Sequence, residues 1–510
     1  MSKQPESYAL LSVYDKRGIV EFAQMLHKLG IKIISTGGTA QELIKHKIPV
    51  IPISKITREP ESFDGRMKTI SFQIESGILF DRSIPDHVAQ AKTLGIKPID
   101  IVVCNLYPFE KKNVVENIDV GGPTMIRAAA KNFQHVLVVI DPADYVMIGT
   151  ALSDNIITKQ LRQKLAAKAF AHISLYDSLI AQFFNKELFP QEITLPLRKL
   201  QDLRYGENPH QKAALYLYPH ISSPFKNMVK KWGRDLSLVN VSDINAGIEV
   251  VQLFKEPAAV VIKHNSPCGI ALGSSISQAL ARAIESDPQS AFGGVIVLNK
   301  SIDIKSAHII GKFKSEIKGN IDIFAAPHID QFAVQYLMQV RKNMGIYTFG
   351  NTCMSEQINI KWVQGGLILQ TADVGIEESF NSWRVVTQVK PSKKQLEQMK
   401  IAWKFITRIR SNSTIIVDEK LPMIRGIGSG QTSRVAATQI ALNQASKYLK
   451  GSILASDSFF PFDDSVKLAA SRGVGAIVQQ GGSIRDEDSI KAADQAHIPM
   501  VFTGRRAFWH

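Results

Sequence analysis

Short apolar runs alternate with amphipathic stretches over residues 1–140. The runs 9–13 and 31–34 have the length of buried strands, and the stretch between them places Ile19, Phe22 and Leu26 on one helical face. Further strands are predicted at 50–53, 99–104 and 136–140. Strands separated by helices in this way are typical of a parallel α/β sheet.

A domain boundary is predicted in the middle of the chain. A helical stretch over about residues 154–184 leads to the segment 188–197, whose two prolines are typical of a linker. We therefore expect a first domain over 1–196 and a second over 197–510. The second domain has the same α/β pattern, with strands predicted at 258–262, 294–298, 367–370, 475–479 and 499–503. No short internal repeat is evident.

The stretch Lys263-His264-Asn265-Ser266-Pro267-Cys268-Gly269 sets a cation beside a proton-transfer group, directly after the apolar run 258–262. A strand end that opens into a turn is a place where functional side chains converge. An isolated Lys-His pair is more often a solvated turn, so a catalytic interpretation depends on agreement from other segments.

Two segments of the first domain have the composition of a phosphate site. Ser35-Thr36-Gly37-Gly38-Thr39 follows a predicted strand and opens a helix, so its backbone N–H groups suit an anion and its glycines allow close approach. Asp64-Gly65-Arg66-Met67-Lys68-Thr69 supplies two cations at alternate positions. A small-residue turn is an equally common explanation of the first segment. The chain has no G-x-x-x-x-G-K-[ST] motif, which argues against a nucleoside triphosphatase.

Polar side chains also follow the strand predicted at 99–104. Asn105-Leu106-Tyr107-Pro108-Phe109 ends this strand, the usual place for functional side chains in a parallel sheet. The segment 119–132 then has the pattern of a loop entering a helix, on which Arg127 and Lys131 share a face. The alternative is a capped helix with exposed basic residues.

Composition narrows the functional classes. A chain of 510 residues, 45% hydrophobic and 21% charged, is typical of a soluble enzyme with two or more domains. The formal net charge of +15 favours small anionic substrates, because the basic residues are dispersed and not interleaved with aromatics as on a nucleic-acid face. The first residues lack the apolar core of a signal peptide, and no apolar run has the ~18 residues of a membrane span, so we expect a cytoplasmic protein.

The three cysteines, Cys104, Cys268 and Cys353, are too few and too widely spaced for a disulfide framework or a C-x-x-C metal site. Pro267-Cys268 begins like half of a zinc-deaminase motif, but Ala271 occupies the position of the second thiolate. Structural zinc and a deaminase-type zinc site are therefore both disfavoured.

Taken in order, these segments resemble the family of bifunctional purine biosynthesis proteins, which joins AICAR transformylase to IMP cyclohydrolase. The matching segments are 12–16, 35–39, 64–69, 105–109, 119–132, 204–211, 263–269, 287–294, 410–413, 426–434, 456–462 and 502–510. The resemblance covers essentially the whole chain. It implies an N-terminal methylglyoxal-synthase-like parallel sheet that carries the cyclohydrolase, and a larger transformylase region of two cytidine-deaminase-like units without zinc. It also implies a homodimer with the transformylase site at its interface.

The resemblance implies that the second domain moves the formyl group of 10-formyltetrahydrofolate, a co-substrate, onto AICAR to give FAICAR. For this work it points to Lys263, His264, Asn412 and His510, the last from the C-terminal motif. Substrate contacts are implied for Arg204, Tyr205, Phe292, Gly293, Asp322, Arg506 and Phe508. The first domain would close FAICAR to IMP with Lys68, Tyr107, Asp119 and Lys131. Its implied binding residues are Ser12, Lys16, Ser35, Thr36, Gly37, Thr39, Arg66, Thr69, Asn105 and Gly121. Neither step requires a metal.

The chain departs from the family pattern at several positions. Residues 70–77 replace a segment that usually contains two histidines, and Glu75 is expected to add a negative charge near the phosphate site. Thr407 and Asp463 replace a usual Lys and Arg, and Arg408 is a candidate to supply the lost lysine charge. We expect these changes to alter affinity or rate and not identity.

Two alternatives stay open on the sequence. One is a transformylase whose first domain binds a phosphorylated ligand with weak or lost cyclohydrolase activity, as the altered 70–77 segment suggests. The other is a non-enzymatic basic module that binds nucleic acid, which would show a steep dependence of affinity on salt.

Overall fold

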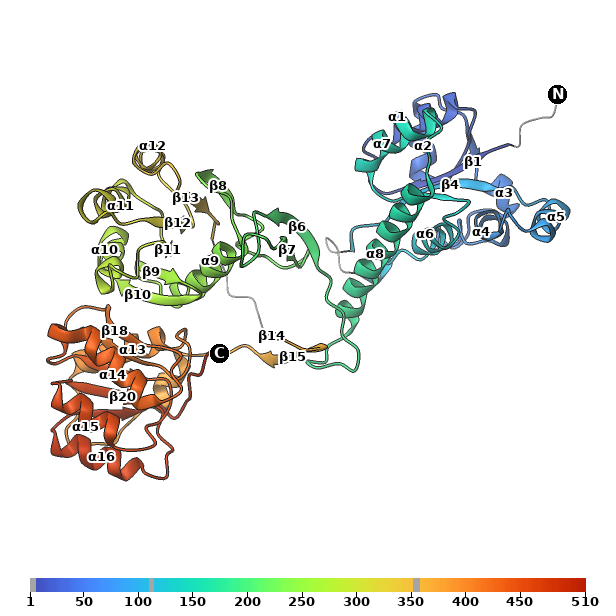
Figure 1. The fold of residues 1–510 in the computed structure, drawn as a ribbon. Helices are drawn as coiled ribbons and strands as arrows, with labels where there is room; N and C mark the ends of the chain where they lie inside the picture. Colours follow the sequence, from blue (N-terminus) through green and yellow to red (C-terminus); the bar gives the residue numbers. More distant parts are fainter. Residues whose placement is uncertain (1–5, 110–113, 352–357) are drawn as a thin grey trace. The chain divides into compact units, whose positions relative to one another are not determined.

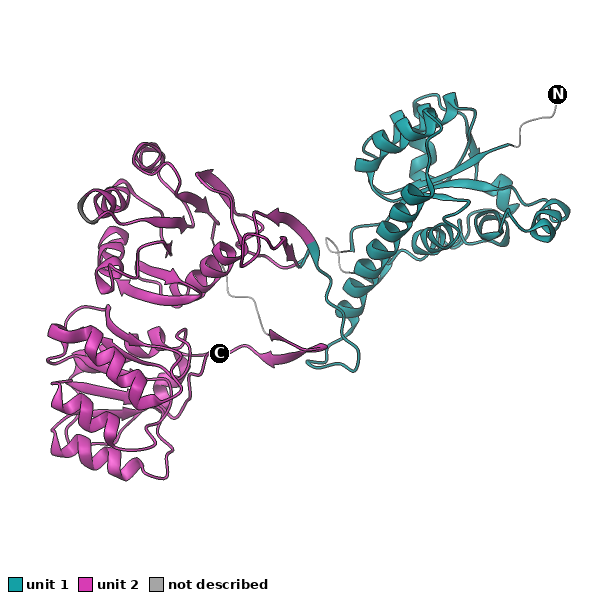
Figure 2. Cartoon of the chain, viewed as in Figure 1, with its two compact units in different colours: residues 1–198, 218–220 teal, residues 199–217, 221–510 magenta. Residues whose placement is uncertain are grey.

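The structure, a computed structural model, describes residues 6–109, 114–351 and 358–510, so Cys353 lies outside the described residues. The chain forms two compact units (Figures 1 and 2). The first unit comprises residues 1–198 with 218–220, and the second comprises 199–217 with 221–510.

The first unit is built on a five-stranded sheet in which every neighbouring pair is parallel, as the apolar pattern predicts. Its order is β3 (Val50–Pro52), β2 (Lys32–Ser35), β1 (Tyr8–Val13), β4 (Ile99–Asn105) and β5 (Leu137–Val139). The chain moves outward from β1 to β3 and then returns to place β4 beside β1. Open α/β sheets bind ligands at such a reversal, which lies here at the carboxyl ends of β1 and β4.

Helices accompany this sheet along the chain. They are α1 (Ile19–Lys28), α2 (Gly37–Lys45), α3 (Ser54–Thr57), α4 (Phe72–Leu79), α5 (Pro85–Thr93), α6 (Gly121–Lys131), α7 (Tyr145–Ser153) and α8 (Lys159–Phe184), with short 3-10 turns at Val115–Asn117 and Pro142–Asp144. The predicted apolar face of α1 is buried. Helix α8, which packs on α6 (Figure 1), begins later than the predicted residue 154, because the Thr158 hydroxyl caps the Leu161 N–H at 3.1 Å.

The second unit contains two six-stranded sheets with the same topology. The first has the order β10 (Ser266–Leu272), β9 (Ala258–Lys263), β11 (Gly294–Leu298), β12 (Ile321–Ala326), β13 (Gly345–Thr348) and β8 (Val229–Trp232). The other has the order β18 (Ile424–Gly428), β17 (Thr414–Val417), β19 (Ile453–Ser456), β20 (Ala476–Gln479), β21 (Met500–Phe502) and β16 (Arg384–Val385). Each sheet consists of an antiparallel hairpin, three mutually parallel strands and an antiparallel edge strand. The expectation of two paired α/β units is therefore confirmed.

The helices repeat as well. Helices α9 (Leu238–Val251), α10 (Ile276–Ser286), α11 (Ile304–Ile317) and α12 (Gln331–Val340) accompany the first sheet, and α13 (Lys393–Ile406), α14 (Arg434–Ala445), α15 (Asp464–Ser471) and α16 (Asp486–Gln495) accompany the second. Gly269 and Gly426 occupy corresponding strands, and a Cβ on either would lie 2.0 Å from a helix carbonyl oxygen, that of Ala283 or Ala441. The same close helix-on-hairpin packing is thus used twice.

The two sheets share one hydrophobic core, in which Ile262 and Val297 of the first belong to the same cluster as Trp403 and Ile415 of the second half. Two small hairpin sheets lie outside this arrangement, formed by β6 (Arg198–Leu203) with β7 (Ala213–Leu217) and by β14 (Ile358–Val363) with β15 (Gly366–Thr371). The strand predicted at 367–370 lies in β15. It belongs to an exposed hairpin and not to a buried sheet.

Candidate active sites

The predicted phosphate residues of the first unit lie at neighbouring strand ends. Ser12 pairs with Cys104 next to Asn105, and Leu11 pairs with Ser35. Helix α2 begins directly after Ser35 and Thr36, so the N–H groups of its first turn have no partner within the helix. A Cβ on Gly38 would lie 3.6 Å from Lys16 Nζ, which places this cation over the same turn. The arrangement suits a phosphate group.

Several predicted binding side chains are already engaged within the protein. The Ser35 hydroxyl donates to the Leu11 carbonyl at 2.7 Å, the Thr36 hydroxyl donates to Glu61, and the Thr39 hydroxyl donates to the Val13 carbonyl at 3.0 Å. These hydroxyls therefore hold neighbouring segments together, and the donors left for an anion are the N–H groups from Gly37 onward together with Lys16.

Asn105 holds the loop that carries Lys16. Its Oδ1 accepts from the N–H groups of Tyr14 and Asp15, both at 2.8 Å, and its Nδ2 donates to the Asp15 carbonyl at 3.0 Å. The Tyr14 ring packs against Tyr107 with centroids 5.1 Å apart. Tyr14 thus contacts a proposed catalytic side chain.

A second group gathers at the start of α6. A Cβ on Gly121 would lie 2.4 Å from Thr69 Oγ1, so the two segments touch and this position requires glycine. Asp119 precedes the helix, and its carboxylate accepts from the Gly122 N–H at 2.8 Å. Burial raises the pKa of Asp119, whereas the Gly122 hydrogen bond and the positive charge of Lys68 act against that rise. Lys68, Thr69, Asp119 and Gly121 therefore form one cluster.

Two predicted residues lie apart from this cluster or are paired elsewhere. Lys131 is the last residue of α6, and eleven helical residues span about 16 Å. It lines a cavity of about 600 Å³ between α6 and α8 with Arg127, Phe133 and Phe170. Arg66 forms an ion pair with Glu116, in which one guanidinium nitrogen lies 2.6 and 2.8 Å from the two carboxylate oxygens.

The altered segment 70–77 forms the start of α4, capped by the Ser71 hydroxyl, which accepts from the Ile74 N–H at 3.2 Å. The Glu75 carboxyl is largely buried, and its Oε1 has no hydrogen-bond partner within the described parts of the chain. This burial raises the pKa of Glu75 to about 7. The negative charge expected from the sequence is therefore suppressed by desolvation below that pH.

Replacing Glu75 with glutamine is expected to stabilise the first unit at pH 8 and not at pH 4.5. In the unfolded chain Glu75 ionises near pH 4.5, whereas in the folded protein it keeps its proton to about pH 7. The wild type therefore loses stability as pH rises between these values, by about 1–2 kcal/mol after allowance for solvent screening. Hydrogen exchange of the α4 amides in the full chain, corrected for intrinsic rates, measures the difference.

The exposed Glu21 of α1 provides the matched control, because Glu21→Gln changes a carboxylate that lies in solvent. A gain for Glu75→Gln that is equal at both pH values would contradict the desolvation argument.

In the second unit, Lys263 and His264 lie where β9 turns into β10. His264 and Asn265 are the two central residues of the hairpin, and both have positive φ, at 52° and 62°. This is the pattern of a type I′ turn, which matches the twist of antiparallel strands. The buried Asp243 of α9 accepts from the Asn265 N–H at 2.7 Å, and this hydrogen bond ties the turn to α9. Burial raises the pKa of Asp243, and the Asn265 hydrogen bond and nearby His264 oppose that rise.

The predicted substrate residues of the first sheet converge on this turn. Lys263 Nζ donates to the Phe292 carbonyl at 2.9 Å, and the N–H of Gly293 donates to the Asn320 carbonyl at 2.7 Å. Asp322 follows on β12 and forms an ion pair with Arg234 at 3.0 Å. Lys263, Phe292, Gly293 and Asp322 thus belong to one site, and Arg234 connects it to a neighbouring cavity.

That cavity has a volume of about 820 Å³ and a strongly basic wall. Its lining comprises Arg204, Tyr205, Lys230, Lys231, Trp232, Gly233, Arg234, Lys342 and Asn343. The Arg204 guanidinium stacks on the Tyr205 ring, 4.6 Å from its centroid. The charge suits a phosphate or carboxylate group. Apart from Arg204 and Tyr205 these residues were not singled out from the sequence, although the run of three cations at 230–234 was a signal for them.

The remaining predicted residues gather around the segment 411–412. Asn412 Oδ1 accepts from Arg434 at 2.7 Å, and the Ser411 N–H donates to the Trp509 carbonyl at 2.9 Å. The Arg506 guanidinium lies 4.4 Å from the Phe508 ring centroid, and the Phe508 and His510 rings are 5.5 Å apart. Asn412, Arg506, Phe508 and His510 therefore form a second group in this unit.

Arg408 does not supply a surface charge in place of Thr407. Its side chain is buried, with the guanidinium 4.8 Å from the Trp509 ring centroid, and burial lowers its pKa. Its role in this structure is to pack beneath the C-terminal segment.

Within the described ranges, no group of three or more His, Cys, Asp or Glu side chains is arranged to hold a metal ion. A search of the same ranges finds no helix with the length and apolar character needed to cross a membrane.

Comparison with known proteins gives a consistent result along the whole chain. Residues 129–444 match the family described as AICARFT/IMPCHase bienzyme, and residues 18–124 match the MGS-like domain. A bifunctional purine biosynthesis protein PurH from Thermoanaerobacter sp. (strain X514) is 43% identical, over 98% of this chain and 99% of its own length. Proteins of the same name from Bacillus mycoides (strain KBAB4) and Oceanobacillus iheyensis are 42% and 41% identical, with the same coverage.

Proposed function

Because the chain belongs to the AICARFT/IMPCHase bienzyme family, it is an AICAR formyltransferase and IMP cyclohydrolase of purine biosynthesis, and we propose that its two units divide these activities. The first domain, 1–196, carries the cyclohydrolase, and the second, 197–510, carries the formyltransferase. The observation that supports this division is that each unit contains its own cluster of predicted catalytic side chains.

Formyl transfer needs a base and an oxyanion donor. The AICAR amine is a poor nucleophile, because its lone pair is conjugated through the imidazole into the carboxamide. His264 takes a proton from this amine as its nitrogen bonds to the formyl carbon, and Lys263 donates to the oxygen on which negative charge develops. The bond from the formyl carbon to N10 of the folate then breaks, and N10 receives a proton. The products are FAICAR and tetrahydrofolate.

The basic cavity supports the binding half of this proposal. Arg204 and Arg234 would hold the phosphate of AICAR, and the Arg234–Asp322 pair connects that cavity to the segment that Lys263 contacts. Fixed orientation of the amine against the formyl carbon would then contribute a large part of the rate. Asn412 and His510 are proposed to act on the same reaction from the second group of residues.

Ring closure is an intramolecular attack of the carboxamide nitrogen of FAICAR on its formyl carbon. One water leaves, formed from the formyl oxygen, one carboxamide proton and the proton of the 5-formamido nitrogen. Lys68 and Tyr107 would donate to the oxygen, and the partly buried Asp119 would accept and return protons. Lys131 stays a prediction from the resemblance, since it lies at the other end of α6.

We further propose 10-formyltetrahydrofolate as the co-substrate, with no metal in either step, and a cytoplasmic homodimer that shares the formyltransferase site. The hairpin β14–β15 supports association with a second copy, because it exposes Trp362 and Ile368, with 71% and 52% of their surface accessible. Exposed apolar groups of this size commonly mark an interface.

Chromatographic analysis of the products from AICAR and 10-formyltetrahydrofolate tests the division, with FAICAR supplied separately as a second substrate. Conversion of AICAR to IMP, with tetrahydrofolate formed in equal amount, is the expected result. FAICAR that accumulates without IMP would favour the alternative, in which the first domain binds a phosphorylated ligand without turning it over.

A further inference from the structure

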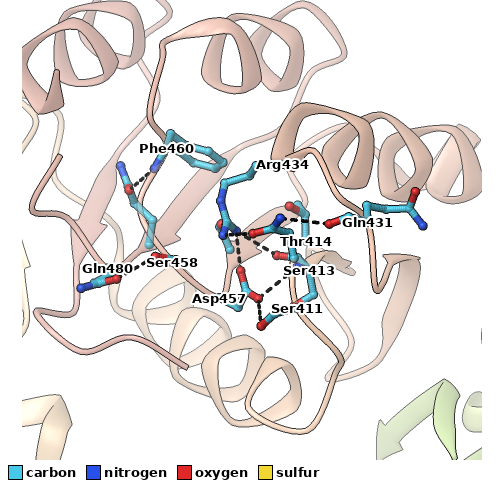
Figure 3. A network of polar contacts seen from close by, with 12 residues as sticks. Ser411, Ser413, Thr414, Gln431, Arg434, Asp457, Ser458, Phe460 and Gln480 are labelled. Atoms are coloured by element: carbon cyan, nitrogen blue, oxygen red, sulfur yellow. Dashed lines mark hydrogen bonds and ion pairs between the residues drawn. The ribbon is translucent and has the colours of Figure 1, made fainter. Parts of the chain in front are cut away.

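Asp457 is a carboxylate with no solvent exposure that lies directly after β19 (Figure 3). It accepts from the Ser411 hydroxyl at 2.6 Å and from the Ser413 N–H at 3.0 Å, and it forms an ion pair with the buried Arg434. A buried carboxylate with three donors is strongly fixed, since loss of a neutral donor would leave a buried acceptor unsatisfied and loss of Arg434 would leave an uncompensated charge.

Arg434 connects Asp457 to Asn412 and so fixes the position of the Asn412 side chain. One guanidinium nitrogen is held by Asp457 and by the Ser456 hydroxyl at 2.8 Å, while the other donates to Asn412 Oδ1 at 2.7 Å. Asn412 Nδ2 donates to the carbonyls of Gln431 and Thr432 at 2.9 and 3.3 Å. These donors and acceptors fix the amide in one orientation. Both of its hydrogens are used, so the free capacity of the Asn412 side chain is one acceptor position on Oδ1.

Ser411 connects Asp457 to the C-terminal segment. Its hydroxyl, which donates to Asp457, also accepts from the Trp509 N–H at 3.2 Å, and its own N–H donates to the Trp509 carbonyl at 2.9 Å. The Ala507 N–H donates to the Asp457 carbonyl at 2.8 Å. The segment that ends in His510 is therefore attached to the same carboxylate residue as Asn412.

We propose, building on the function proposed above, that Asp457 is a positioning residue for formyl transfer. Its carboxylate sets the direction of the Asn412 acceptor through Arg434 and seats the His510 segment through Ser411. Asn412 would accordingly accept a hydrogen bond from the AICAR amine and not donate one to the formyl oxygen. The competing explanation is a buried ion pair that only stabilises the fold.

Asp457→Asn tests the proposal in the full chain. Asparagine keeps the shape but has one accepting oxygen, so its NH₂ group faces either the Arg434 guanidinium or the donors of Ser411 and Ser413. We expect kcat for formyl transfer to fall about tenfold or more, with KM for AICAR changed less than about twofold, because the basic cavity is untouched. In an Asn412→Ala background the same change should add only about threefold, the share carried by the Ser411 branch, because the branch through Arg434 acts on Asn412 and is not additive with its loss.

A second readout follows the C-terminal segment. Carboxypeptidase Y should release Trp509 several-fold faster from Asp457→Asn than from the wild type. Ser411→Ala removes only the hydroxyl link, so it tests the same branch if Asp457→Asn does not fold. Trp509 should be released faster from Ser411→Ala as well, and kcat for formyl transfer should fall about threefold or more.

Asp418→Asn is the matched control, because Asp418 also pairs with a buried arginine, Arg425, at 2.7 Å, and lies at the other end of β17 from Asn412. It should leave formyl transfer unchanged in protein that remains folded. Wild-type kcat in folded Asp457→Asn or Ser411→Ala, or full additivity with Asn412→Ala, would overturn the proposal. Wild-type activity in Asn412→Ala alone would instead overturn the site assignment on which it rests.

Discussion

His264→Ala is expected to reduce formyl transfer by about 10²–10⁴-fold, the usual contribution of a general base, while ring closure of supplied FAICAR continues at the wild-type rate. The imidazole is the proposed proton-transfer group of the β9–β10 turn, next to the ammonium of Lys263. Without it, the conjugated amine of AICAR has to lose its proton to water during attack. Stopped assays with AICAR and with FAICAR, run on the same protein sample, measure the two rates.

His308→Ala is the matched control for this experiment. His308 is an exposed histidine of the same unit that packs edge-on against Tyr336, and its loss should leave both rates unchanged. Less than a tenfold loss of formyl transfer in His264→Ala would remove His264 from the role of base.

Lys68→Ala is expected to give the opposite phenotype, with FAICAR accumulating from AICAR and the conversion of FAICAR to IMP slowed by about 10²–10³-fold, as for loss of one oxyanion donor. The Lys68 charge acts on the partly buried Asp119 near Gly121, so its removal takes away a donor and also favours the protonated form of Asp119. The measurement is the rate of IMP formation from supplied FAICAR.

Lys45→Ala, at the exposed end of α2, controls for the general loss of a positive charge. If Lys68→Ala converts FAICAR at the rate of Lys45→Ala, ring closure does not depend on Lys68. A normal rate of formyl transfer in both variants would show that the second unit is intact.

The sequence predicts the buried sheets well, because apolar runs of four to six residues between helices allow few other arrangements. The strands at 294–298 and 99–104 illustrate this. The repeated topology of the second unit was expected from the family resemblance and not from the apolar pattern, since two sheets share a topology through alternation and handedness and not through identical residues. The 367–370 run was apolar enough for a core strand, but it lies in an exposed hairpin.

The turn at Lys263 and His264 could be found from sequence, because its two functional side chains are neighbours in the chain. The role of Asp457 could not, since it depends on contacts with Ser411 and Arg434 that only the folded chain brings together. The charge state of Glu75 below neutral pH likewise depends on the fold, because burial raises the pKa of this carboxyl to about 7. A carboxylate contributes negative charge only when water or a donor remains within reach, and burial is a property of the fold.

The paired positive φ angles at His264 and Asn265 have a consequence for attempts to make this protein more robust. An L-residue in the left-handed region is disfavoured by roughly 1–2 kcal/mol relative to its ordinary conformations, whereas glycine adopts that region freely. A library of random variants ranked by heat resistance alone would therefore enrich glycine at position 264, whereas the asparagine at 265 already tolerates this conformation. The most heat-resistant variants would then lack the His264 imidazole. Such a screen therefore has to measure formyl transfer from its first round.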